Sequence, residues 1–247
     1  MLAEFTREEL AAGMDAVAME ILTETGMEGP PVDVLEVARQ LGITVAMDDR
    51  QDCRARYVRL NGRRPSRTRA TILLRPDARE ERRQWAVAHE IGEHVAHRVF
   101  AAWGVDPQET LPRAREEVAN CLAGRLLLPT PWYEVEGRQS GWDLIALKAR
   151  FSTASHEIIA RRMLECRPPV VITIFDLGSI YLRRSNLPGR VPPPSPAEMQ
   201  CWRTVHQSNR PLRAYDGLRT VQGWPVHENG WKREILRAEV EEGATDE

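Results

Sequence analysis

The sequence predicts an α+β protein with a mainly helical core, a small three-stranded antiparallel sheet and a small α+β domain towards the C-terminus. Several long segments repeat apolar residues at helical spacing, whereas short apolar runs between turn residues indicate strands. The segment Arg167-Pro168-Pro169 interrupts these patterns, so we expect a first domain over residues 1–167 and a second over 168–247. A chain of 247 residues is long enough for a main domain and a small second one.

The N-terminal segment is predicted to hold two helices. Thr6 can cap a helix over residues 6–26, in which one stripe of apolar side chains comprises Leu10, Met14, Val17 and Ile21. A shorter helix is expected over residues 32–41. Gly42 suits its C-terminal end, because glycine tolerates the left-handed backbone that often ends a helix.

Three strands are expected next, over residues 43–47, 55–60 and 69–75. The last two are joined by a polar turn that begins at Asn61-Gly62, a pair that is typical of hairpins. Arginines gather around this turn, namely Arg63, Arg64, Arg67 and Arg69. We interpret this basic cluster as the solvated tip of a hairpin, and a contact with substrate or nucleic acid is the alternative.

The remaining elements are each bounded by proline, glycine or polar residues. In the first domain, helices are predicted from after Pro76-Asp77 to about Ala101, and over residues 109–128, 142–150 and 155–165. The second domain is expected to contain a hairpin with strands 170–175 and 179–183, an irregular proline-rich stretch over 187–196, a helix near 197–207 and further strands. No motif in this second domain indicates a chemical role.

Composition argues against several classes of protein. A net charge of −2 gives no overall attraction to nucleic acid or to an anionic membrane. The four cysteines are scattered without a Cys-x-x-Cys pair, unlike those of cysteine-rich zinc modules or secreted disulfide frameworks. No signal peptide is recognisable, and no apolar run approaches the about 20 residues that span a bilayer. We therefore expect a cytoplasmic protein with no membrane partner.

One predicted helix carries most of the side chains that can do chemistry. Over residues 85–97, the helical period places the apolar side chains on one face. The opposite face carries three of the six histidines and two carboxylates, namely His89, Glu90, Glu93, His94 and His97. An ordinary amphipathic helix with a charged outer face is the alternative interpretation. Three histidines so close together favour a metal site.

Two segments together resemble a known family. Ala88-His89-Glu90-Ile91-Gly92, followed by His97, resembles the Ala-His-Glu-Leu-Gly-His-x-x-x-His element of the ImmA/IrrE metallopeptidases. Downstream, the segment from Glu116 to Pro129 resembles the family's Glu-x-x-Ala-Asn-x-Phe-Ala-Ala-x-Leu-Leu-Met-Pro helix. Weaker matches extend the resemblance over roughly residues 30–165. Two motifs in the same order are more specific than either one alone.

The resemblance implies a zincin-like fold and a metal-dependent endopeptidase. It makes His89 and Glu116 ligands of a divalent metal, zinc by family resemblance, and it makes Glu90 the general base. The implied partner is a protein, such as a helix–turn–helix transcriptional repressor, whose cleavage switches on genes for stress response or mobile elements. A zincin base takes a proton from the attacking water and later delivers it to the leaving amine.

The sequence departs from the family pattern at the second ligand. The family has a histidine four residues after the first one, whereas this chain has Glu93. A carboxylate also binds zinc, so a triad of His89, Glu93 and Glu116 is chemically reasonable. It places two negative charges on the ion, which lowers its Lewis acidity and favours manganese or iron relative to zinc.

Several alternatives stay open for the site. A rearranged site can recruit His94 or His97, although His94 needs a helix distortion such as a π-bulge to share an ion with His89. Glu117 can replace Glu116 as a ligand. Tyr133, just past the second motif, is a candidate transition-state stabiliser, and simple packing is its alternative role.

Two alternatives stay open for the function. A metal-free relative can keep the fold as a binding or regulatory protein. A DNA-binding regulator is the other: residues 142–165 are similar to a helix–turn–helix, with Ser155 capping a helix that carries Arg161 and Arg162. The same element can equally pack beside the peptidase core without touching DNA.

Overall fold

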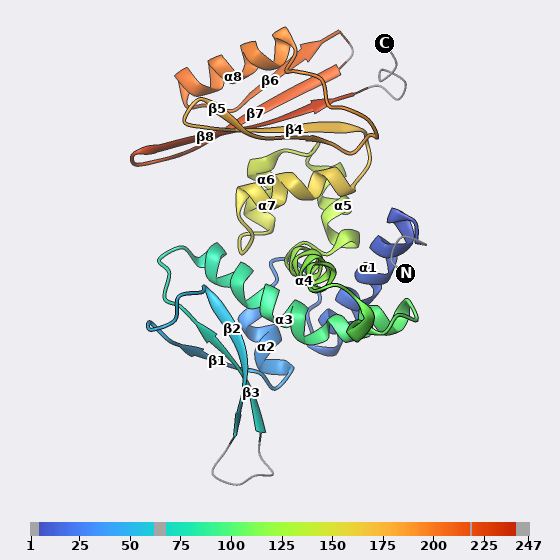
Figure 1. Ribbon diagram of the computed structural model, residues 1–247. Coiled ribbons are helices and arrows are strands. Elements are labelled where there is room, and N and C mark those ends of the chain that lie inside the picture. The colour runs from blue at the N-terminus through green and yellow to red at the C-terminus, as the bar shows by residue number, and fades with distance from the viewer. Residues whose placement is uncertain (1–4, 62–67, 218, 241–247) are drawn as a thin grey trace. The chain divides into compact units, whose positions relative to one another are not determined.

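The computed structural model describes residues 5–61, 68–217 and 219–240, which form two compact units (Figure 1). The first unit comprises the chain up to residue 135 together with residues 150–155, and the second comprises residues 136–149 and the chain from residue 156 onward. The α+β class is confirmed. These units are groups of residues in mutual contact, whereas the boundary expected at residue 167 separates domains that fold independently. That boundary stays a prediction.

The two N-terminal helices form as predicted. Helix α1 (Arg7–Glu24) begins with a capping box, in which Thr6 and Glu9 each bond to the backbone of the other. Helix α2 (Val34–Gln40) follows, and its first residue is tied to a later helix because Val34 N donates to Gln84 Oε1 at 2.9 Å. These bonds satisfy backbone N–H groups that a helix start would otherwise leave unpaired.

The three-stranded sheet has the order β1-β3-β2, with β1 (Thr44–Met47), β2 (Ala55–Asn61) and β3 (Thr68–Leu74). β2 and β3 pair antiparallel as expected, but β1 pairs parallel to β3, so the prediction of a purely antiparallel sheet is wrong. The physical reason is that β3 is the most buried strand of this sheet, with Ile72 and Leu74 in the core. It takes the centre and leaves the arginine-bearing β2 at the edge.

The predicted turn of this hairpin, with Gly62, Arg63, Arg64 and Arg67, lies outside the described residues. Arg69 of the same predicted cluster is exposed on β3.

Two long helices form the centre of the first unit (Figure 1). Helix α3 (Glu80–Ala102) packs against α4 (Pro112–Leu127), which a short 3₁₀ turn (Pro107–Glu109) precedes. Within the described residues, no helix is both long and apolar enough to cross a membrane.

Three shorter helices follow, of which the first was not predicted from the sequence. Helix α5 (Thr130–Gln139) begins directly after Pro129, which we expected to end the helical segment. Pro131 lies in the first turn of α5, where the missing N–H costs nothing, so these prolines mark a helix start. Helices α6 (Leu144–Arg150) and α7 (His156–Arg162) match the prediction, and a 3₁₀ turn (Met163–Glu165) continues α7.

The second unit is built on a five-stranded antiparallel sheet with the order β5-β4-β8-β7-β6. Its strands are β4 (Val170–Asp176), β5 (Ser179–Ser185), β6 (Leu212–Asp216), β7 (Arg219–Glu228) and β8 (Trp231–Glu239). Helix α8 (Pro196–Ser208) lies between β5 and β6 in the sequence. Figure 1 shows α8 along one face of this sheet and α7 along the other. Beneath α8 lies a core of buried residues, namely Phe175, Cys201, Val205, Val221, Leu236 and Ala238.

Candidate metal centre

The three predicted ligands converge on one point of the first unit. His89 and Glu93 lie one turn apart on α3, and Glu116 reaches them from α4. His89 Nε2 lies 3.9 Å from Glu93 Oε1 and 3.7 Å from Glu116 Oε1. The three ligand atoms all lie within 4.8 Å of one another. The structure therefore brings together the residues that the sequence analysis selected.

The spacing of these atoms fits a divalent ion. Ligand bonds of about 2.0–2.2 Å in tetrahedral geometry place ligand atoms about 3.3–3.6 Å apart. Both measured separations from His89 Nε2 are slightly longer, so small side-chain movements would close the site around an ion. Glu93 and Glu116 are about half exposed, which leaves them free to make that adjustment. One imidazole and two carboxylates suit zinc, manganese or iron.

Asn120 contacts two of the candidate ligands, a role that was not predicted from the sequence. Its Nδ2 donates to Glu116 Oε1 at 3.2 Å, one turn away on α4. Its Oδ1 must then accept, so the His89 ring, whose Nδ1 lies 3.1 Å away, carries its proton on Nδ1. This tautomer leaves the Nε2 lone pair facing Glu93 and Glu116. Such outer bonds are typical of metal-binding histidines.

The close approach of α3 to α4 depends on a glycine. A Cβ atom at Gly92 would lie 2.6 Å from the carbonyl oxygen of Ala119. The two backbones therefore meet at a separation that a larger residue would not allow. Gly92 lies between His89 and Glu93 on the chain, and Ala119 lies between Glu116 and Asn120. This contact therefore sets the distance between the candidate ligands of α3 and that of α4.

Glu90 lies beside the ligands but is held apart from them. Its side chain is buried, and its Oε2 accepts a hydrogen bond from Tyr57 N of β2 at 2.6 Å. Burial raises the pKa of the Glu90 carboxyl above its ordinary value, although the bond from Tyr57 acts the other way. The carboxylates of Glu93 and Glu116 also raise this pKa, while His89 lowers it. A carboxylate with a raised pKa suits a group that must accept a proton and later release it.

The other candidate ligands are engaged elsewhere. The His94 ring stacks on Tyr57 with ring centres 4.9 Å apart, and burial lowers the pKa of this imidazole, an effect that His97 and two arginines increase. His97 Nδ1 lies 3.0 Å from the backbone oxygen of His94, and Glu117 pairs with Arg113 at 3.0 Å. None of these three belongs to the described group of converging ligand atoms.

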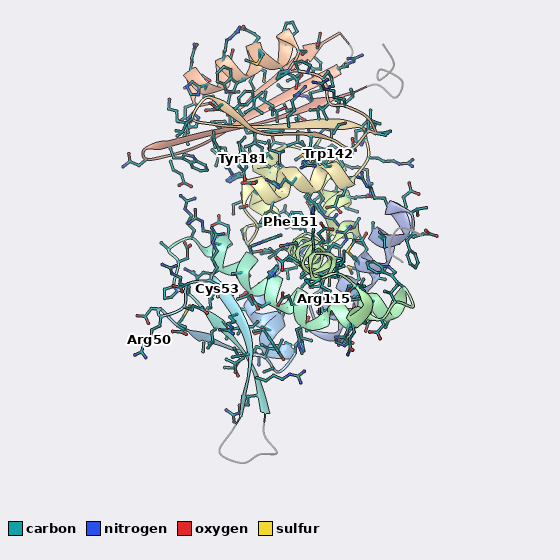
Figure 2. The ribbon with its side chains drawn as sticks, in the orientation of Figure 1. Arg50, Cys53, Arg115, Trp142, Phe151 and Tyr181 are labelled. Carbon is teal, nitrogen blue, oxygen red and sulfur yellow. The ribbon has the colours of Figure 1, made fainter. Side chains whose placement is uncertain are left out.

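Tyr133, the candidate transition-state stabiliser, is fully buried. Its ring meets that of Phe151, which is labelled in Figure 2, edge to face with centres 5.5 Å apart. This packing accounts for the aromatic residue at this position. The role of its hydroxyl in catalysis stays a prediction.

The arginines of the helix–turn–helix-like segment are occupied within α7 and the turn that follows it. Arg161 pairs with Glu157 at 2.7 Å. Arg162 is almost completely buried and pairs with Glu165. A buried guanidinium cannot reach a DNA phosphate, so Arg162 does not support the DNA-binding alternative.

Comparisons with known proteins agree with the motifs. The model of the IrrE N-terminal-like domain, a peptidase family, matches residues 38–164, just over half of the chain. No curated protein matches the sequence. A solved structure of a Mycobacterium tuberculosis transcriptional regulator has a similar fold, with a TM-score of 0.63 and 19% identity over 91% of this chain and 74% of that chain. Because this match covers more than half of the chain and includes α3 and α4 with the candidate ligands, the chain belongs to the ImmA/IrrE family of metallopeptidases.

Proposed function

We propose that this protein is a metal-dependent endopeptidase that cuts a protein partner, with His89, Glu93 and Glu116 as metal ligands and Glu90 as general base. The observation that carries the proposal is the convergence of three ligand atoms within 4.8 Å of one another on two helices. The family match and the raised pKa of Glu90 support it.

Each side chain has a defined task in this mechanism. A bound divalent ion would supply Lewis acidity towards water and the scissile carbonyl. Asn120 keeps the His89 lone pair directed at the ion and holds Glu116 in place. Glu90 accepts the proton of the attacking water and transfers it to the leaving amine. Its hydrogen bond to Tyr57 N fixes the carboxylate beside the site before substrate arrives.

Strand β2 offers a place for an extended substrate. Tyr57 N donates to Glu90, so it points away from the neighbouring strand β3. Residues 55 and 59 direct their backbone groups to the same side, because backbone direction alternates along an antiparallel strand. In the described sheet β2 has β3 as its only partner strand. An extended peptide that adds to this edge passes directly by Glu90.

The partner that suits this proposal is a transcriptional repressor of the helix–turn–helix class. The resemblance of the two motifs to the ImmA/IrrE family implies this partner. The structural neighbour is named a transcriptional regulator. Cleavage of such a repressor would switch on genes of stress response or of mobile elements. The site of action that we expect for this reaction is the cytoplasm.

One observation favours a second candidate function. Glu93 stands where the family has a histidine, and two carboxylates weaken the Lewis acidity of the ion. A relative that has lost catalysis would keep the fold to bind and regulate a partner. The two candidates differ in the expected effect of Glu90→Gln, which removes the base but can keep the hydrogen bond from Tyr57 N.

Metal content provides the direct test of the proposed site. We expect protein purified without a histidine tag to hold nearly one ion in this site, and both His89→Ala and Glu93→Ala to release it. Glu117→Ala is the matched control, because Glu117 is an exposed glutamate of α4 that pairs with Arg113 instead. Elemental analysis measures the ion. If the apoprotein is offered zinc, manganese and iron and the parent, His89→Ala and Glu93→Ala proteins then bind equal amounts of metal, this site is excluded. That result would favour the non-catalytic function.

The choice of metal is expected to depend on Glu93. In Glu93→His, an imidazole replaces one carboxylate and restores the two-histidine helix of zincins. We expect the ratio of zinc affinity to manganese affinity to rise, because nitrogen ligands favour zinc and carboxylates favour harder ions. Competition between the two metals, followed by elemental analysis, measures this ratio. An unchanged ratio would show that Glu93 does not contact the ion.

A further inference from the structure

The second unit holds another group of metal-ligating side chains, contributed by three different elements. Within the described residues two groups of this kind occur, and the second comprises His206, His227 and Glu234. Glu234 Oε1 lies 2.8 Å from His206 Nδ1 and 2.6 Å from His227 Nε2. His206 belongs to α8, His227 to β7 and Glu234 to β8. The proposed peptidase function does not use any of them.

Strand pairing brings His227 to Glu234. Lys232 lies opposite His227 across β7 and β8, and Glu234 lies opposite Pro225. His227 and Glu234 are therefore diagonal neighbours on the same face of the sheet, within reach of long side chains.

The close packing of α8 on β7 brings the second histidine to the same place. A Cβ atom at Gly223 would lie 2.9 Å from both Cys201 Sγ and Val205 Cγ2, so the helix rests directly on the strand. His206 follows Val205, and Trp202 lies one helical turn before His206 on the same face of α8. Both side chains thus reach Glu234.

Glu234 is oriented as a metal-binding carboxylate is. Its side chain has no exposed surface, and its second oxygen, Oε2, accepts a hydrogen bond from Trp202 Nε1 at 3.1 Å. The Trp202 ring in turn stacks on Phe175 with centres 4.9 Å apart, which restricts its movement. A fully buried carboxylate is costly unless positive charge compensates it. A divalent cation bound by the two imidazoles and this carboxylate would supply that charge.

We propose that His206, His227 and Glu234 bind a divalent transition metal of the zinc type, separate from the peptidase site. Two imidazoles and one carboxylate form a frequent zinc ligand set that leaves a fourth position for water or a small ligand. The His206 side chain is 32% exposed, so this side of the group is open to an entering ion. Its exposure also allows the movement needed to widen the measured distances to the about 3.3–3.6 Å between zinc ligands.

Zinc stoichiometry in a background without the first site tests this proposal. The His89→Ala chain, dialysed against zinc and then against metal-free buffer, is expected to retain one zinc per chain. Adding His227→Ala or Glu234→Gln to this background should abolish the retained zinc. His156→Ala is the matched control, because His156 begins α7 in the same unit and is outside the group, and it should leave the zinc in place. Cobalt absorption gives an independent readout of the ligands.

Two further variants keep the result decisive if a buried substitution unfolds the chain. His206→Ala changes a partly exposed residue and should weaken zinc binding by more than about tenfold with an unchanged circular dichroism spectrum. Trp202→Phe keeps the ring stack but removes the bond to Glu234, and it should weaken zinc binding by about 10–100-fold. The proposal is overturned if the folded His89→Ala chain retains no zinc. It is equally overturned if the retained zinc persists in the His206→Ala variant.

Discussion

Replacing Glu90 by glutamine is expected to lower the rate of peptide cleavage by about 10²–10⁴ while the bound metal stays in place. Glutamine has nearly the same shape and can still accept the hydrogen bond from Tyr57 N, but it cannot take a proton from water at neutral pH. The ligands His89, Glu93 and Glu116 are unchanged in this variant. Loss of activity with full metal content is therefore the signature of a general base.

The measurement is incubation of the protein with a helix–turn–helix repressor under zinc, manganese and iron, followed by detection of fragments. Glu80→Gln is the control, since Glu80 is an exposed glutamate in the first turn of the same helix, far along α3 from the ligands. If the repressor stays intact when it is incubated with the parent protein and each of the three metals, the proposed protease activity is contradicted. Equal cleavage by the parent and Glu90→Gln proteins contradicts the role of Glu90 alone.

Two of the three candidate ligands could be grouped from the sequence because they follow a local rule. His89 and Glu93 are one helical turn apart, so their shared face follows from the helix period alone. Glu116 required the family motif, because the contact between α3 and α4 is a property of the tertiary fold. Asn120 was visible in the motif without a role, since its two bonds become meaningful only when His89 and Glu116 lie on either side of it.

The errors in the fold prediction have a common cause. The strand pattern located β1, β2 and β3 correctly, but it does not contain the order of the strands, so the parallel pairing of β1 with β3 was missed. Similarly, α4 ends before Pro129 as predicted, but α5, which begins at Thr130 with Pro131 in its first turn, was not predicted from the sequence. Local signals give the positions of elements, whereas their pairing depends on which strand buries the most apolar surface.

The histidine and glutamate group of the second unit illustrates the limit of sequence motifs. His206, His227 and Glu234 have no regular spacing, because each comes from a different helix or strand. Their meeting depends on strand register and on the small residue Gly223 beneath α8. A pattern search along one sequence does not contain this information.

Replacing Gly92 by alanine is expected to lower the free energy of unfolding by about 1–3 kcal/mol, since the added methyl group meets backbone rather than a movable side chain. The new Cβ would lie 2.6 Å from the Ala119 carbonyl oxygen, so α3 and α4 must separate. For a chain of this length, each kcal/mol corresponds to a melting temperature lower by about 2–4 °C. Thermal unfolding followed by circular dichroism measures the change.

Gly124→Ala is the matched control, because it makes the same substitution inside α4 where the added Cβ meets nothing within 4 Å. Alanine there should raise stability by about 0.5–1 kcal/mol, since glycine is the weaker helix former. The two variants also separate stability from metal binding. Gly92→Ala should move Glu116 away from His89 and so lower the affinity of the site for the metal ion. Gly124→Ala should leave this affinity unchanged. If both variants are equally stable and bind metal equally well, the close helix contact does not set the geometry of the site.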